Sequence, residues 1–339
     1  MKILQIVNPV VPFPANTVGG IERVVQYLME ELLLKGHEIT LLAHSDSVVS
    51  KDVRFIPIGR YQDQTKAIKI IWQHLLTTKY DVIHNHGRLI YFLPLIWSKV
   101  RKIHTFHMAE LETTSFLRFT KLNAKNLTLS PCGKWIQEKS SHLKGDWAFV
   151  NNGLPKKLYS YKKKTIDPKA PMVIICRMDK NKGVYDAIKL SKITNRRLVI
   201  AGKIGDCQHE IDWFKNDILS QCDGNHIKFI GPVNDQQKQE LLNIASVLLI
   251  PTTDSEAFNT TMLEANACGC PVISYNRFCF NEYIVNGING FKGDTFQDLV
   301  EAISKLNQIE RQTCRDFFED NYTSAIMTAN YLKLYQSKI

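Results

Sequence analysis

The sequence predicts an α/β fold made of two Rossmann-like domains in tandem, each a doubly wound parallel sheet, that face each other across a cleft. Short β-branched runs alternate with longer amphipathic segments, which is typical of parallel βαβ units. A second series of such runs begins after a lysine- and proline-rich stretch, residues 155–171, that has the composition of a linker. The chain of 339 residues is also long enough for two cores.

The first series predicts seven strands and one clear helix. Apolar residues from Ile21 to Leu32 recur at helical spacing, and Gly36 stands where a C-terminal cap is expected. The expected strands are residues 3–7, 39–43, 53–57, 81–84, 102–106, 127–129 and 147–150.

The second series predicts five strands, at residues 172–176, 198–201, 227–230, 247–250 and 272–274. Residues 310–336 have a helical pattern, with Tyr331, Leu334 and Tyr335 forming an apolar stripe. We therefore expect an N-terminal domain over residues 1–152 and a C-terminal domain over residues 153–320. Ligands of such sheets lie at the carboxyl ends of the strands.

The composition, 44% hydrophobic and 22% charged, is that of a globular protein. Gln5, Asn8 and Pro9 interrupt the apolar start, so we interpret it as a buried strand rather than a signal peptide. The apolar run 89–97 is about half the length that spans a bilayer. We expect a cytoplasmic protein whose eight scattered cysteines are reduced, since the spacing of Cys268 and Cys270 is not a usual zinc pattern.

The net charge of +10 is concentrated in the first half, where residues 1–150 carry 19 basic and 12 acidic side chains. A basic surface suits an anionic partner such as a phosphorylated lipid or a membrane face, although solvated lysines explain it equally well. Segments 98–104 and 117–125 mix basic and apolar residues as interfacial surfaces do, which suggests peripheral contact with the inner face of the membrane. No nucleic-acid motif accompanies the charge.

A glycine pair, Gly19-Gly20, ends the loop between the first strand and the first helix. Glycines at a helix N-terminus let an anion approach the backbone amides. The pair is not a Gly-x-Gly-x-x-Gly fingerprint, which weakens a nicotinamide-dinucleotide interpretation, and a plain turn remains open.

Two basic residues, Arg177 and Lys182, follow the first strand of the second domain. At the carboxyl end of that strand, an arginine can give a diphosphate a forked contact and a lysine a point charge. An exposed charged turn is the alternative.

Two glutamates follow the strand at 247–250. Glu264 lies in a helix that is apolar nearly all round, so its carboxylate needs a partner, and two ribose hydroxyls would serve. Eight helical steps would turn Glu256 about 80° away from Glu264, so we place Glu256 in the preceding loop. There it could accept sugar hydroxyls beside the amides of Phe258 and Asn259 at the helix N-terminus.

Together these motifs resemble the family-four retaining glycosyltransferases of the GT-B fold, over nearly the whole chain and in the same order. Arg177 and Lys182 match the family's Arg-x4-Lys-Gly motif, and Glu256 and Glu264 match its Glu-x7-Glu motif. Thr105-Phe106-His107 resembles the motif whose histidine lies beside the reacting sugar. Further matches are Gly19-Gly20, Asn152-Gly153, Gly231-Pro232-Val233 and Gly269-Cys270-Pro271-Val272-Ile273.

The resemblance implies a metal-independent enzyme, without cofactor, that moves a hexose from a nucleotide-diphosphate sugar, such as a UDP-sugar, to a glycan, lipid or small-molecule acceptor with retained anomeric configuration. It implies catalytic roles for His107, Arg177, Lys182 and Glu256. It also implies that a C-terminal helix, residues 321–339, belongs to the first domain. The residues that it places at the donor are Gly19, Gly20, Arg177, Lys182, Gly231, Val233, Glu256, Ala257, Phe258, Asn259, Thr260 and Glu264.

Two other functions remain open. Nucleotide-sugar 2-epimerases share the fold and need no acceptor, and a nucleotide-sugar-binding protein without turnover would carry the same motifs. Asn259 stands where the family often has glycine, which puts close approach of this loop to the phosphates in question.

Overall fold

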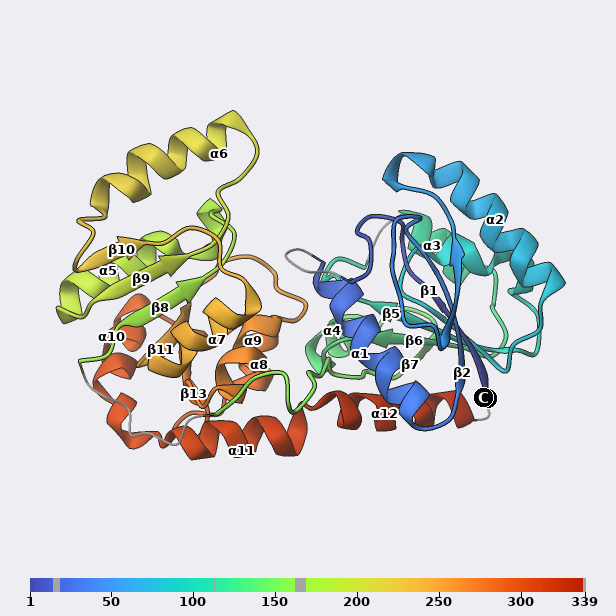
Figure 1. Ribbon diagram of the computed structural model, residues 1–339. Helices are drawn as coiled ribbons and strands as arrows, with labels where there is room; N and C mark the ends of the chain where they lie inside the picture. Colours follow the sequence, from blue (N-terminus) through green and yellow to red (C-terminus); the bar gives the residue numbers. More distant parts are fainter. Residues whose placement is uncertain (15–18, 112–113, 162–168, 338–339) are drawn as a thin grey trace. The chain divides into compact units, whose positions relative to one another are not determined.

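The computed structural model describes residues 1–14, 19–111, 114–161 and 169–337. The chain divides into two compact units: Met1–Pro155 with Thr323–Ile339 form unit 1, and Lys156–Tyr322 form unit 2. The boundaries expected from the sequence stand a few residues away from these. Each unit is an α/β layer structure around one parallel sheet (Figure 1).

Unit 1 contains a seven-stranded parallel sheet in the order β3-β2-β1-β4-β5-β6-β7. Because the strand order reverses between β1 and β4, the loops that follow these two strands diverge and leave room for a ligand. The strands are β1 Lys2–Ile6, β2 Glu38–Ala43, β3 Val53–Pro57, β4 Val82–Asn85, β5 Arg101–Phe106, β6 Leu127–Pro131 and β7 Asp146–Trp147.

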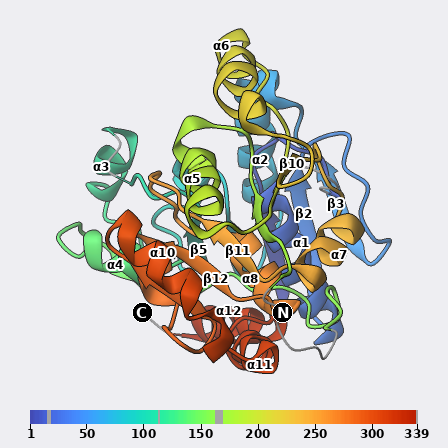
Figure 2. The same ribbon diagram turned by 90° about the vertical axis from the view of Figure 1, so that its left-hand side faces the viewer.

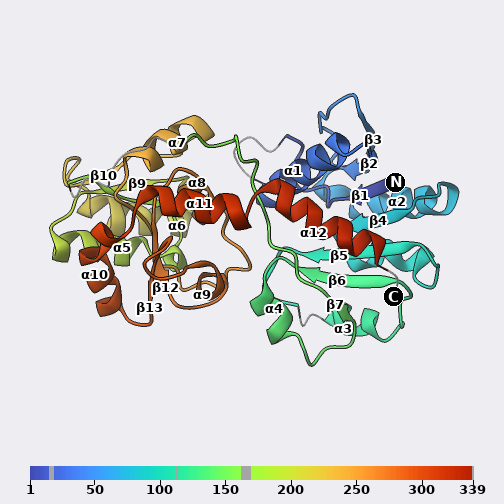
Figure 3. The same cartoon turned by 90° about the horizontal axis from the view of Figure 1, so that it is seen from below.

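Alternating side chains of the unit 1 strands face two helical layers. His104 and Phe106 of β5 contact rings of η2 (Leu89–Leu95) and α3 (Thr114–Thr120), whereas Thr105 bonds to Tyr331 of α12 (Ser324–Gln336). On the α12 side lies α1 (Gly20–Leu34), which Figure 3 shows beside α12. The other face packs on α2 (Gln64–Thr77). Two short elements, η1 (Tyr61–Asp63) and α4 (Lys134–Lys139), complete the unit.

Unit 2 contains a six-stranded parallel sheet in the order β10-β9-β8-β11-β12-β13, with its reversal between β8 and β11. The strands are β8 Met172–Ile175, β9 Leu198–Ala201, β10 Ile227–Phe229, β11 Val247–Ile250, β12 Val272–Tyr275 and β13 Gly290–Gly293.

One face of the unit 2 sheet packs on α5 (Val184–Thr194), η4 (Phe214–Ile218) and α10 (Phe296–Ser304), and Figure 2 looks onto this part of the chain. Helices α7 (Asp235–Ile244), α8 (Thr260–Ala267) and α11 (Arg311–Asn321) pack against one another away from that layer. The remaining elements are η3 (Lys180–Lys182), α6 (Gln208–Trp213), η5 (Leu219–Gln221), α9 (Cys279–Tyr283) and η6 (Leu306–Gln308).

Three sequence-based expectations about the elements are wrong. The helix expected over residues 310–336 is two helices, because the Thr323 hydroxyl caps α12 by accepting a hydrogen bond from the Ile326 N–H. The strand expected at 147–150 is the shorter β7. Strand β13 was not expected, since its Gly-Phe-Lys-Gly sequence lacks a β-branched run.

The expected interfacial surface over residues 98–104 is also wrong, because most of that segment is the inner strand β5. Lys102 is fully buried, and its Nζ donates to the Ser98 and Val100 carbonyls at 2.9 and 3.0 Å. Arg101 is buried as well and donates to the Leu334 carbonyl at 2.8 Å. Within the described part of the chain, no helix is long and apolar enough to cross a membrane.

Candidate functional site

In unit 2, hydrogen bonds join the loop that follows β8 to the loop that follows β11, at the point where the strand order reverses. The Asn181 carbonyl accepts hydrogen bonds from the Thr253 N–H at 2.9 Å and from the Thr252 hydroxyl at 2.8 Å. Gly183 follows with a φ of +78°, and a Cβ there would lie 2.0 Å from the Pro251 carbonyl oxygen. This close approach requires glycine and fixes the position of the preceding Lys182.

Lys182 lies between two carboxylates of the β11 loop. Its Nζ is 2.6 Å from Glu256 Oε1 and 3.1 Å from Asp254 Oδ2. Burial alone would lower the pKa of Lys182, but the contacts with Glu256 and Asp254 outweigh burial and raise it. Lys182 therefore stays cationic, and Glu256 is oriented by it.

Arg177 lies on the more open side of the same loops, with 59% of its side chain exposed. Its Nη2 donates to Asp179 Oδ2 at 2.6 Å, and this hydrogen bond raises the pKa of Arg177. The Asn181 N–H and the Arg177 guanidinium lower the pKa of Asp179. The guanidinium is thus held at the carboxyl end of β8 while remaining accessible to an anion.

Helix α8 starts beside these loops with Asn259 as its cap. The Asn259 Oδ1 accepts hydrogen bonds from the N–H groups of Thr261 and Met262 at 3.1 and 3.3 Å. Asn259 has an extended backbone, with a φ of −112°, so the position needs no glycine. Its neighbours in the same turn are Ala257, which is buried, and Phe258 and Thr260, which are partly buried.

The partner of Glu264 is a lysine that the sequence interpretation did not identify. Lys238 Nζ of α7 lies 2.9 and 2.8 Å from the two carboxylate oxygens of Glu264, whose side chain is only 4% exposed. A partly buried cation therefore satisfies this carboxylate, and the contact of Glu264 with ribose hydroxyls stays a prediction. Glu256 lies in the loop before α8 and contacts Lys182, so the two glutamates contact different lysines.

The loop Gly231-Pro232-Val233, which the resemblance places at the donor, follows β10. The Gly231 carbonyl accepts from the Gly202 N–H at 2.8 Å, which joins the ends of β9 and β10. Val233 lines a shallow hollow of about 360 Å³ together with Ile230 and Ile244.

In unit 1, Gly19 and Gly20 begin α1 after the loop that follows β1. Gly19 has a φ of +109° and a ψ of +64°, a left-handed conformation that favours glycine. Gly20 is helical, and a Cβ there would meet no atom within 4 Å. The backbone conformation therefore explains why glycine stands at position 19, whereas a Cβ at position 20 would meet no neighbouring atom.

His107 lies just after β5, and its Nε2 is 3.0 Å from Nδ1 of His86, which follows β4. Burial lowers the pKa of His107 to about 4 and that of His104 to about 3. His84 and His86 are buried too, and burial holds the pKa of each well below 6.5. These four rings are therefore neutral at physiological pH.

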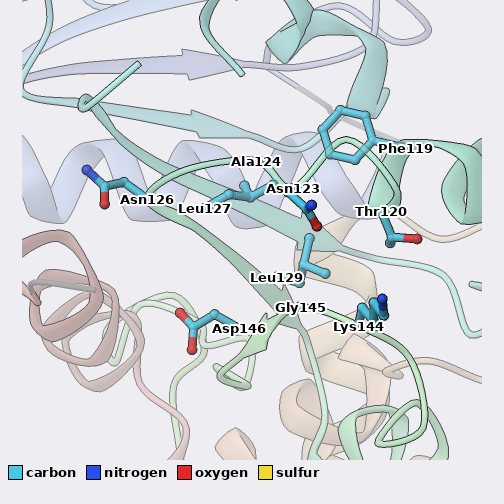
Figure 4. Close-up of a pocket in the computed structure, with 10 residues that line it drawn as sticks. All are labelled: Phe119, Thr120, Asn123, Ala124, Asn126, Leu127, Leu129, Lys144, Gly145 and Asp146. Atoms are coloured by element: carbon cyan, nitrogen blue, oxygen red, sulfur yellow. The ribbon is translucent and has the colours of Figure 1, made fainter. Parts of the chain in front are cut away.

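A cavity of about 250 Å³ in unit 1 is separate from these residues (Figure 4). It is lined by Asn126 and Leu127 at the start of β6 and by Asp146 at the start of β7. His86 and His107 follow the opposite, carboxyl ends of β4 and β5. Among the described residues, no group of three or more His, Cys, Asp or Glu side chains could hold a metal ion.

Two family models match the chain, one in each half. The model described as Glycosyltransferase Family 4 matches residues 18–150, and the model described as Glycosyl transferases group 1 matches residues 159–323. The chain belongs to the family-four glycosyltransferases of the GT-B fold.

Relatives of the glycosyltransferase include two proteins named phosphatidyl-myo-inositol mannosyltransferase. The one from Mycobacterium leprae is 21% identical over 322 residues, which cover 83% of this chain and 81% of that protein. The one from Propionibacterium freudenreichii is 31% identical over 71 residues, which cover 21% of this chain and only 18% of that protein.

Solved structures of the same fold cover nearly the whole glycosyltransferase. Sucrose-phosphate synthase from Thermosynechococcus elongatus has a TM-score of 0.80 at 15% identity, covering 99% of this chain and 98% of that one. HepE from Anabaena, in complex with UDP-glucose, has a TM-score of 0.74 at 15% identity and covers 98% of both chains.

Proposed function

We propose that this glycosyltransferase moves a hexose from a UDP-sugar to an acceptor, with retained anomeric configuration and without a metal ion. The proposal rests on the loops that follow β8 and β11, which hydrogen bonds join at the point where the strand order reverses. In these loops Lys182 contacts Glu256 and Asp254, and Arg177 follows β8, as Lys182 does. The UDP-glucose complex of HepE supports a nucleotide-sugar donor.

The departing diphosphate accounts for the two cations. When the bond between the anomeric carbon and the β-phosphate oxygen breaks, negative charge grows on that phosphate. Arg177 can bind it with a forked contact and Lys182 with a point charge, and fixed charges of this kind stabilise a transition state without reorganising. Asp254 and Asp179 keep both cations in position before the donor binds.

The carboxylates and the histidine account for the rest of the donor. Glu256 accepts hydrogen bonds from hydroxyls of the transferred sugar, Glu264 holds the ribose hydroxyls, and His107 orients the sugar. The acceptor oxygen attacks the anomeric carbon from the face that the phosphate leaves. Its proton passes to the leaving phosphate oxygen, so the products are the glycoside and UDP.

The acceptor that we propose is lipid-linked and lies at the inner face of a membrane. Trp97, Leu117 and Leu122 are 63%, 41% and 37% exposed, and the Trp97 indole N–H donates to the Leu122 carbonyl at 2.9 Å. The names of the mannosyltransferase relatives support a lipid acceptor. Exposed basic residues beside these three are Lys99, Arg118, Lys121 and Lys125.

Hydrolysis of the donor tests the reaction without requiring the acceptor to be known. The protein is incubated with a panel of α-linked UDP-hexoses and EDTA, and proton NMR follows the first sugar released to water. Retention predicts the α-anomer, whereas initial release of the β-anomer would overturn the proposal. An isomerised UDP-sugar would identify a 2-epimerase, and binding of UDP without any loss of donor would identify a binding protein.

Vesicle binding tests the membrane surface. The glycosyltransferase should bind vesicles of an anionic phospholipid in a salt-dependent way, because basic side chains near the surface each contribute about 1 kcal/mol. Lys121→Glu should weaken this binding, whereas Lys66→Glu, an equal charge change at an exposed position of α2, should not. Equal binding by both variants would refute the proposed surface.

A further inference from the structure

A line of buried polar side chains runs from β1 to His107. Gln5 of β1 is fully buried, and its Oε1 lies 2.8 Å from Nε2 of His86. The other ring nitrogen of His86 lies 3.0 Å from Nε2 of His107. His86 is 5% exposed, whereas His107 is partly exposed. The line therefore leads from the interior of the sheet to the histidine that we place beside the reacting sugar.

The orientation of the Gln5 amide decides where the protons of this line lie. Its Nε2 faces the hydroxyl of Tyr335 at 3.4 Å, and that hydroxyl lies 2.7 Å from Nδ1 of His84. With its N–H₂ group directed at Tyr335, Gln5 presents its oxygen to His86. An amide oxygen only accepts hydrogen bonds, so Nε2 of His86 carries a proton.

The tautomer of His107 follows from that of His86. A neutral imidazole has one N–H and one bare nitrogen, so Nδ1 of His86 is an acceptor. It can be satisfied by His107 only if Nε2 of His107 carries the proton. Burial first, and then the neighbouring His84, His107 and His104, lower the pKa of His86 and oppose a second proton on its ring. The second nitrogen of His107, Nδ1, is then bare.

We propose that Gln5 and His86 are positioning residues that fix His107 as its Nε2–H tautomer, so that His107 meets the substrate as a hydrogen-bond acceptor. The partner it selects is a hydroxyl group that donates a proton, on the transferred sugar or on the acceptor. His107 in this form cannot donate to the leaving group. This role deepens the proposed function and rests on it for the place of the sugar.

Helix α12 takes part in the same arrangement. Tyr335 holds the Gln5 amide in its orientation, and His84 bonds on its other side to Thr105 Oγ1 at 2.7 Å. Thr105 in turn lies 2.9 Å from the hydroxyl of Tyr331. Of the two tyrosines of the C-terminal helix, Tyr335 thereby lies in the middle of the network that sets His107, and Tyr331 lies at the end opposite His107.

Nitrogen-15 NMR of the histidine-labelled protein reads the tautomers without any assay of activity. Long-range proton–nitrogen correlations distinguish the two nitrogens, and His86→Asn and His107→Asn assign the resonances. We expect Nε2–H and a bare Nδ1 in both rings at pH 7.5. A proton on Nδ1 of His107 in the wild-type protein would overturn the proposal, even if donor binding and transfer are normal.

A substitution tests the direction of the effect. In Gln5→Glu, a carboxylate beside Nε2 stabilises a doubly protonated His86, whose Nδ1–H then forces His107 into the Nδ1–H form. We expect His107 to change from the Nε2–H to the Nδ1–H tautomer. The kcat should fall about ten-fold, which corresponds to one misdirected hydrogen bond, while the affinity for UDP stays within about two-fold of wild type. Gln73→Glu, the same change at an exposed position of α2, should alter neither.

The positioning role of Gln5 and the proposed transfer reaction are tested by different results. An unchanged His107 tautomer in a folded Gln5→Glu variant would refute the positioning role, whereas no UDP binding by the wild-type protein would refute the proposed function. If Gln5→Glu does not fold, the tautomers of the wild-type protein still decide.

Discussion

Replacing Lys238 by methionine would leave the Glu264 carboxylate buried without its cation. The pair is enclosed, with side-chain exposures of 12% for Lys238 and 4% for Glu264, and its two contacts are 2.8 and 2.9 Å. Removing one partner of a buried pair costs about 3–5 kcal/mol. Because Lys238 keeps some access to water, we place the cost at the lower end, about 3 kcal/mol.

For a unit of this size, that loss lowers the melting temperature by about 6–12 °C. Trp213 is the only tryptophan in unit 2, so the resonance of 5-fluorotryptophan at this position reports unfolding of that unit separately. Urea titrations of Lys238→Met, Glu264→Gln and the double variant then form a cycle. Lys228→Met, at an exposed lysine of β10, is the matched control.

The double variant should recover most of the stability, since it removes both charges together. Stability of Lys238→Met equal to wild type, or a double variant as unstable as Lys238→Met, would refute the assignment of a buried pair. The affinity for UDP adds a second readout. If Lys238 orients Glu264 toward the ribose, Lys238→Met should bind UDP and its 2′-deoxy analogue with nearly equal affinity, while wild type prefers UDP.

Three further predictions follow from the geometry. Gly183→Ala should lose at least about 1–2 kcal/mol in a urea titration, from the left-handed backbone, and more from the clash with Pro251; wild-type stability would contradict this. Asn259→Ala should lose about 1 kcal/mol through the missing cap of α8, whereas Asn259→Asp should not. The folded pKa values of His104 and His107, about 3 and 4, lie below 6.5. Stability should therefore fall as pH drops from 6.5 toward 4, by about 1.4 kcal/mol per pH unit for each histidine, and His107→Asn should reduce that slope.

The two parallel sheets could be predicted because their strands are buried on both faces and so appear in the sequence as β-branched runs. Strand β13 could not be predicted in this way: it lies at the edge of the sheet beside β12, and a Cβ at Gly290 would lie 2.1 Å from the Val272 carbonyl oxygen, so glycine stands where a β-branched residue is usual. The break before α12 could not be predicted for a different reason. Thr323 is a single capping residue inside an otherwise helical pattern, and one hydroxyl outweighed the periodicity on either side.

The separation of Glu256 from Glu264 could be predicted because it depends only on local helix geometry. The partner of Glu264 could not, since Lys238 lies 26 residues earlier and on another helix. The sequence nonetheless held an indication of this partner. Lys238 stands three and four positions before Leu241 and Leu242, on the buried face of α7, where a lysine is rarely found without an acidic partner.

Gln5 carried a similar signal. A glutamine inside an apolar first strand argued against a signal peptide, but its burial against His86 and Tyr335 depends on contacts across 81 and 330 residues of chain. Asn266 shows the same limit. Its Nδ2 donates to the Cys270 and Asn289 carbonyls and its Oδ1 accepts from Tyr283 and Asn289, so both ends of this buried amide are hydrogen-bonded, and Tyr283 and Asn289 are far away in the sequence.

Calorimetric titration of UDP measures the donor site without any acceptor. We expect the wild-type glycosyltransferase to bind UDP with the same affinity in EDTA and in magnesium. We also expect Lys182→Ala and Arg177→Ala each to weaken binding by at least about ten-fold, as for lost charge-assisted hydrogen bonds. Binding that depends on magnesium, or that both alanine variants leave unchanged, would contradict a metal-independent diphosphate site at Arg177 and Lys182.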